Sequence, residues 1–118
     1  MKTKLNPSDM NDEQLRIAVA EALGWTYAKP AYSRVLNVHA VVGLDPDGER
    51  RTTPNWPADL NACHQFEKTL SRDQQQEYVR QLIKLFKEPL PLMDFNFAML
   101  NATARQRCEA LLAVLKPE

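Results

Sequence analysis

Residues 52–70 read TTPNWPADLNACHQFEKTL and mark the point where an extended part of the chain gives way to helix. Proline has no backbone N–H and is kept out of sheet interiors, so the two prolines that flank Trp56 close off any sheet before them. From residue 58 to residue 70, apolar side chains recur at helical spacing. They are Leu60, Cys63, Phe66 and Leu70. The stretch therefore predicts an amphipathic helix with one buried stripe.

Upstream of this stretch the sequence predicts a β-hairpin. Residues 35–44, VLNVHAVVGL, are rich in β-branched side chains and too short for a typical helix. Residues 45–48 form a turn sequence, because Pro46 fixes φ at the second position and Gly48 accepts a positive φ. Residues 49–53 are polar and are expected to return as an edge strand.

The N-terminal part predicts a further helix. Residues 1–10 are polar and contain a proline, which indicates a flexible lead-in. Asn11 can cap a helix, with Gln14 at the capping-box position, and Gly24 suits the helix end. We therefore expect a single α+β domain over residues 11–118.

Two more helices and a strand are expected after residue 70. Residues 71–86 follow Ser71 as a cap, and the last helix begins at Asn101 or Thr103. Residues 95–100 are short, aromatic and apolar, and predict a third strand. The order predicts a small layered α+β sandwich, a short, mainly antiparallel sheet of about three strands packed by about four helices. The side chains expected to be buried against that sheet are Leu60, Phe66, Leu82, Ile83, Leu111 and Leu112.

Composition narrows the classes of function. The 118 residues carry 15 Lys and Arg against 15 Asp and Glu, and this balance makes a nucleic-acid partner unlikely. Cys63 and Cys108 lie in apolar helical patterns and are expected to be buried thiols. The polar N-terminus does not resemble a signal peptide and no stretch suits a membrane span, so we expect a cytoplasmic protein with no membrane partner.

His64 is the first candidate for chemistry. Asp59, Asn61 and Glu67 are its near neighbours on the predicted helix, and a histidine-dependent enzyme or metal module could be centred there with Asp59 or Glu67. The spacing is not that of a known metal helix, so no metal and no cofactor are predicted. A surface histidine bonded to a neighbour is the interpretation we favour. His39 is interpreted as a strand histidine without a nucleophile beside it.

Asn61 and His64 are candidate binding residues, and further candidates come from two basic clusters and one aromatic side chain. Arg50 and Arg51 lie on the predicted polar strand, and Arg105 and Arg107 lie in the first turns of the last helix. If all four shared a face, they could bind a nucleic-acid backbone or an acidic partner, although a solvated surface is the simpler interpretation. Trp56 would be a binding anchor if it were exposed.

Two segments, residues 52–70 and NATARQRCEALLAVLKPE at residues 101–118, resemble small bacteriophage proteins grouped as the phage ABA sandwich domain. Members share a Gly-Trp pair, a Pro-Asp-Gly turn, a proline-led motif and a closing Ala-Thr-Ala-x-Gln-Arg helix. The matching positions here are Gly24-Trp25, Pro46-Asp47-Gly48, Pro54, Asp59 to Ala62, His64, Glu67 and Ala102 to Arg107. The chain departs from that pattern at Trp56, Cys63 and Phe66, and residues 27–41 are longer than the usual link.

The resemblance implies a sheet layered between helices and a phage or prophage origin, and it implies no established activity. We therefore expect a non-enzymatic accessory or protein-interaction module in the host cytoplasm. Its partner would be a host or phage protein, or a second copy of the chain. The alternatives are an enzyme centred on His64 and a weak nucleic-acid binder that uses the four arginines.

Overall fold

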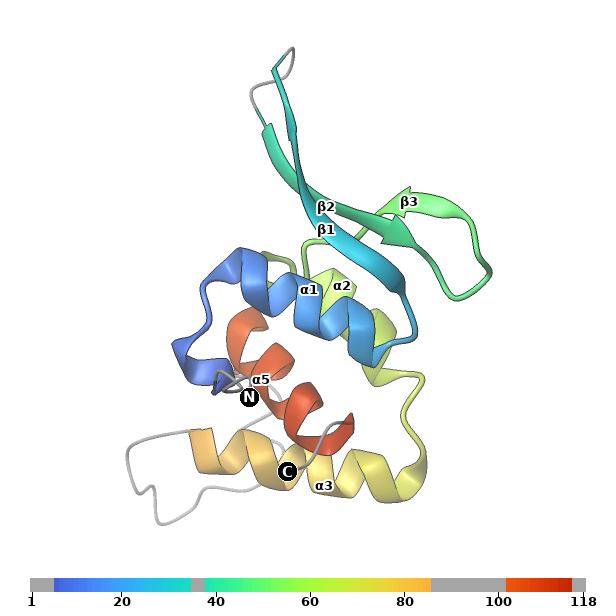
Figure 1. Cartoon of the computed structure of the whole chain (residues 1–118). Helices are drawn as coiled ribbons and strands as arrows, with labels where there is room; N and C mark the ends of the chain where they lie inside the picture. The colour runs from blue at the N-terminus through green and yellow to red at the C-terminus, as the bar shows by residue number, and fades with distance from the viewer. Residues whose placement is uncertain (1–5, 35–37, 86–101, 116–118) are drawn as a thin grey trace, which may run out of the picture.

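The computed structural model describes residues 6–34, 38–85 and 102–115. Within them the chain forms a three-stranded antiparallel sheet of order β1-β2-β3 and four α-helices (Figure 1). The predicted α+β class is confirmed. The elements are η1 (Pro7–Asp9), α1 (Asp12–Ala22), β1 (Thr26–Ser33), β2 (Val38–Leu44), β3 (Arg50–Thr52), η2 (Trp56–Ala58), α2 (Leu60–Glu67), α3 (Arg72–Leu85) and α5 (Ala104–Leu115).

Three of the helices begin with a capping box, as their sequences predict. In each, a cap side chain accepts a bond from the backbone three residues on, and the residue there bonds back to the cap N–H. The pairs are Asn11–Gln14, Ser71–Gln74 and Thr103–Gln106. Gly24 follows α1 with φ +99°, a conformation that favours glycine. Part of the expected lead-in forms the 3-10 helix η1.

The sheet differs from its prediction in the identity of its first strand. Thr26–Ser33 forms β1 and pairs with β2 along its length. No strand was predicted for this stretch. Pro30 within this run and a register shift between Thr26 and Lys29 disguise the strand pattern. The predicted strand at residues 95–100 lies outside the described residues.

The hairpin closes tightly at its base because of Gly43. A Cβ atom on Gly43 would lie 2.9 Å from the carbonyl oxygen of Thr26 and 3.1 Å from Cα of Ala28, closer than a side chain allows. Between these two β1 residues, Tyr27 adopts φ 56° and its ring is 82% exposed. The glycine therefore lets β2 pass close to the irregular part of β1. From this base the β1–β2 hairpin extends away from the helices (Figure 1).

Pro30 protects the free edge of β1. Thr53 N donates to Val41 O at 2.8 Å, so the backbone of Val41 faces β3. Pro30 pairs with Val41, and its own backbone groups therefore face away from β2, toward the open edge. A proline there offers no N–H to a second strand, which limits edge-to-edge pairing.

We expect Pro30→Thr to make the chain associate as its concentration rises, because the substitution restores an N–H at the middle of the open edge. Sedimentation velocity over a range of concentrations measures this association. Ala31→Thr is the matched control, since the backbone of Ala31 faces β2 in the ladder. Equal sedimentation of the two variants would show that Pro30 does not protect the edge.

The core lies mainly among the helices. α5 runs between α1 and α3, with α2 and η2 beside it, and α1 is the helix that packs against β1 and β2 (Figure 1). Of the side chains expected to face a shared sheet, Phe66, Leu82, Leu111 and Leu112 are buried, but they pack within this helical cluster. None of the helices in the described part of the chain has the length and hydropathy that a membrane crossing requires.

The predicted burial of Leu60 is wrong. The buried side of α2 carries Ala62, Cys63 and Phe66, while Leu60 is 46% exposed. At about 100° per residue, Leu60 lies about 160° around the helix from Ala62. The i, i+3 spacing of Leu60 and Cys63 suggested one stripe, but the helix turns Leu60 toward solvent.

Candidate functional site

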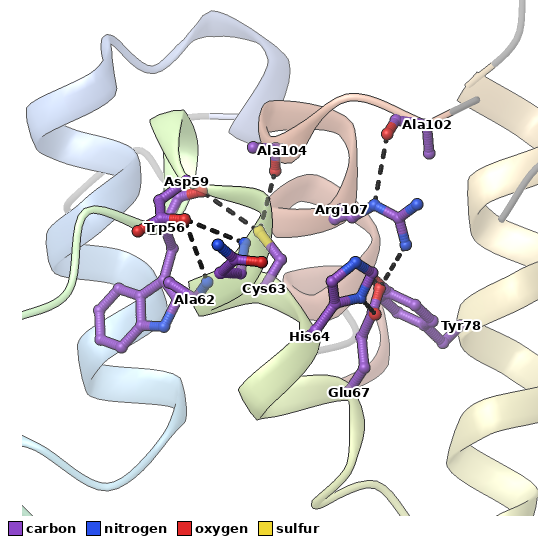
Figure 2. Close-up of polar contacts among 11 residues, drawn as sticks. Trp56, Asp59, Ala62, Cys63, His64, Glu67, Tyr78, Ala102, Ala104 and Arg107 are labelled. Atoms are coloured by element: carbon purple, nitrogen blue, oxygen red, sulfur yellow. Dashed lines mark hydrogen bonds and ion pairs between the residues drawn. The ribbon is translucent and has the colours of Figure 1, made fainter. Parts of the chain in front are cut away.

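His64 and Glu67 meet on the outer side of α2. Nδ1 of His64 lies 2.8 Å from Oε1 of Glu67, and the His64 side chain is half-exposed (Figure 2). This is the neighbour-bonded surface histidine that the sequence favours. Because Nδ1 is occupied, Nε2 is the ring nitrogen that remains for solvent or a ligand.

Glu67 is the centre of a larger polar cluster. Its Oε2 accepts a bond from Nη1 of Arg107 at 2.7 Å and another from the hydroxyl of Tyr78 (Figure 2). Arg107 also donates from Nε to the carbonyl of Ala102 at 3.3 Å. The cluster therefore joins α2, α3 and α5 through one carboxylate.

The charges in this cluster compensate one another. The side chains of Arg107 and Glu67 are 3% and 12% exposed. Burial lowers the pKa of Arg107, but the hydrogen bond and negative charge of Glu67 outweigh it, so the pKa is raised overall. The carboxylate of Glu67 thus stabilises the charged guanidinium of Arg107 inside the fold.

Tyr78 makes stability depend on pH at the alkaline end. Burial, then the hydrogen bond to Glu67, raise the pKa of Tyr78 above its usual 10.0. Above about pH 10 the unfolded chain loses this proton and the folded chain keeps it, so the free energy of unfolding should fall as pH rises. The expected slope is about 1.4 kcal/mol per pH unit for this group.

Urea unfolding of Tyr78→Phe between pH 8 and pH 11, from about two units below to about one above the usual phenol pKa, tests this expectation. Above pH 10 the variant should lose about 1.4 kcal/mol per pH unit of this slope, whereas the contribution of the buried Cys108 thiol remains. Tyr27→Phe is the control, because Tyr27 is largely exposed. An unchanged slope in Tyr78→Phe would contradict the assignment.

A cavity of about 380 Å³ opens beside the cluster, between α2 and α3. Its apolar surface comes from Leu70, Val79 and the ring of Tyr78, and polar groups surround them. The complete lining is His64, Glu67, Lys68, Leu70, Gln75, Tyr78 and Val79. None of these described lining residues is a serine or a cysteine, so the lining holds no nucleophile of the Ser–His or Cys–His kind.

The two thiols lie elsewhere. Cys63 is fully buried on α2, one turn before Glu67, and donates from Sγ to the carbonyl of Trp56 at 3.2 Å (Figure 2). A hydrogen bond with Cys63, followed by burial, raises the pKa of Cys108. Both cysteines are free and buried, as predicted, and a protonated buried thiol is a poor nucleophile.

Asp59 does not join His64. It is the N-cap of α2, and its Oδ1 accepts bonds from the backbone N–H groups of Asn61 at 2.9 Å and Ala62 at 3.4 Å. Asn61 itself is exposed beside it. Among the described residues, no set of three or more His, Cys, Asp or Glu is placed to hold a metal ion.

The four arginines do not form one exposed basic face. Arg107 is buried against Glu67. Arg105 bonds Asp12 at 2.7 Å, and Arg51 bonds Asp45 at 2.9 Å. These pairs give most of the arginines a local structural role, and Arg50 is exposed on β3.

Trp56 is not an exposed anchor either. It is 3% exposed and makes an edge-to-face contact with Trp25, with ring centroids 6.3 Å apart. The flanking prolines place it in the short helix η2, which packs on α1 and α5. Its large apolar surface is therefore used in the core.

Tyr78 and Arg107 were missed as partners of Glu67. The sequence position of Arg107 did indicate burial, because it lies three residues after Ala104 and four before Leu111 on the buried side of the last helix. A charged residue in such a stripe needs a buried partner. Tyr78 carried no signal beyond its apolar spacing.

No family model, curated protein or solved structure matches this chain.

Proposed function

We propose that this chain is a non-enzymatic protein-interaction module whose α2–α3 cavity receives an apolar side chain of a partner protein. The observation that supports this most is the cavity itself. It combines an apolar surface with a few polar groups at its margin, as ligand pockets commonly do.

The hydrogen bonds that Glu67 already makes favour a binding role for the cavity over catalysis by this carboxylate. Both of its oxygens are engaged, one by His64 and the other by Arg107 and Tyr78. The Glu67 carboxylate that lines the cavity is therefore already compensated by Arg107, and Nε2 of His64 can orient an incoming backbone or side chain. A partner side chain would meet mainly apolar surface there.

Leu60 extends this surface. It lies one helical turn before His64, at i and i+4, and is 46% exposed. Exposed leucine beside an apolar cavity suits a contact that excludes water around a central anchor. The sequence resemblance described above leads us to propose a phage or prophage origin and a host or phage partner.

Site-directed photocrosslinking tests this proposal. A benzophenone amino acid at Lys68, an exposed residue of the cavity margin, should capture a discrete partner band from bacterial lysate. The same group at Thr52, exposed on β3, is the control. Equal capture at both positions would refute the proposed site.

Leu60→Ala should weaken the captured interaction about tenfold, the effect of losing about 1.4 kcal/mol at an interface. Because Leu60 is exposed, the substitution should leave the urea midpoint nearly unchanged. Binding to the purified partner, once the band has been identified, measures the effect. Undiminished binding would exclude Leu60 from the contact.

A second candidate is acid–base catalysis by His64, favoured by the Nδ1–Glu67 contact, which fixes the ring and leaves Nε2 exposed. Under that alternative, His64→Gln would lower turnover of a hydrolysable ester or phosphodiester by roughly 100-fold or more. A binding module would show no turnover to lose. Assays of both proteins on the same substrates separate the two candidates.

A further inference from the structure

A second cavity lies between the first half of α1 and the first half of β2. Its volume is about 240 Å³, and it shares no lining residue with the α2–α3 cavity. It is lined by Asp12, Glu13, Arg16, His39, Ala40, Val41 and Asn55. The protein interaction proposed for the α2–α3 cavity does not involve this second cavity. Ligand binding here is therefore independent of that proposal.

Arg16 is held in this cavity by neutral acceptors. Its Nε donates to Oγ1 of Thr53 at 2.7 Å and to the carbonyl of Pro54 at 3.0 Å, and Nη2 donates to the carbonyl of Thr53. Burial lowers the pKa of Arg16, and no carboxylate of the described residues lies within ion-pair distance of it. The fold thus orients a half-buried cation without supplying its counter-charge.

The geometry leaves one edge of the guanidinium available. Nε and Nη2 are used on one side, while Nη1 has no hydrogen-bond partner among the described residues. The Nη1–Nη2 edge can therefore donate two parallel hydrogen bonds to one carboxylate, the geometry that arginine favours. Because three bonds already fix the side chain, little further ordering is needed on binding.

Negative charge on the same cavity limits what can bind. Glu13 is exposed and has no ion-pair partner among the described residues, whereas Asp12 is bonded to Arg105 at 2.7 Å. Two carboxylates would repel a multiply charged anion, and the one at Glu13 can receive an ammonium group. Ala40 and Val41 add an apolar wall.

We propose that the α1–β2 cavity binds a small zwitterion, such as a free amino acid, with its carboxylate on Arg16 and its ammonium group on Glu13. The volume of about 240 Å³ lies below the roughly 300–1,000 Å³ of pockets for drug-sized ligands, which suits a ligand of this size. Small aliphatic side chains fit the wall formed by Ala40 and Val41.

Titration of the full chain with four probes, followed by amide and arginine-Nε NMR shifts, tests the proposal. L-Alanine carries both charges, N-acetyl-L-alanine only the carboxylate, and L-alanine amide only the ammonium group, while inorganic phosphate is a simple anion. L-Alanine should shift Arg16, His39 and Asn55 saturably, and each single-charge probe should bind roughly tenfold more weakly.

Two variants assign the roles. Glu13→Gln, at an exposed position, should reduce alanine binding to that of N-acetyl-L-alanine. Arg16→Lys should weaken alanine and N-acetyl-L-alanine alike, because lysine lacks the two-bond edge, and its amide spectrum shows whether it remains folded. The proposal fails if alanine causes no saturable shift, if phosphate binds more tightly than alanine, or if Glu13→Gln leaves alanine affinity unchanged.

Discussion

Arg107→Met is expected to lower the free energy of unfolding by about 3–5 kcal/mol. The substitution leaves Glu67 charged and buried without its cation, while Tyr78 alone remains to bond that oxygen. With side chains 3% and 12% exposed, water cannot replace the lost partner well. A small domain with a total stability of about 5–15 kcal/mol would lose a large part of it.

Urea unfolding of Arg107→Met, Glu67→Leu and the double variant measures this coupling. The double variant should recover much of the loss, because two apolar side chains leave no unpaired buried charge. Arg80→Met is the matched control, because the Arg80 side chain is 65% exposed and pairs with Glu77 on the surface of α3. It should cost about 1 kcal/mol or less. Strictly additive losses in the double variant would show that the pair is not coupled.

The helix starts were predictable because their determinants are local. Asn11, Ser71 and Thr103 each have a glutamine three residues on, and the cap bonds form within that span. The contact of His64 with Glu67 was foreseeable for the same reason, since i and i+3 are neighbours on any α-helix.

Strand β1 was not predictable on local grounds. Pro30 and the register shift near Tyr27 break the alternation that identifies a strand, and pairing with β2 overrides that weak signal. The partners of Glu67 were hidden for a related reason. Arg107 lies 40 residues away in sequence, and only the packing of α5 on α2 and α3 brings it near.

Trp56 shows that the role of a motif residue depends on its burial. The sequence made it a binding anchor only on the condition that it is exposed. Instead the chain folds into η2 and places the ring at 3% exposure against Trp25. The backbone carbonyl of Trp56 also accepts the hydrogen bond from the Cys63 thiol. Trp56 therefore connects η2 to α2.

Trp56→Ala should therefore lower the free energy of unfolding by about 3–5 kcal/mol, because it leaves a large void among α1, η2 and α5. The lost edge-to-face contact with Trp25 contributes about 0.5–1.5 kcal/mol of interaction beyond buried area. Trp56→Phe should cost less, since it retains a ring in the same space. Urea unfolding followed by far-UV circular dichroism measures all three proteins.

Tyr27→Ala provides the comparison, because Tyr27 is 82% exposed and its truncation should change stability by about 0.5 kcal/mol or less. Comparing these variants therefore distinguishes an aromatic residue of the core from an aromatic binding anchor. A core residue loses stability when truncated, whereas a binding anchor loses affinity at unchanged stability. If Trp56→Ala kept the wild-type urea midpoint but lost capture of the crosslinked partner, Trp56 would be an anchor, and its burial among the helices would not describe the protein in solution.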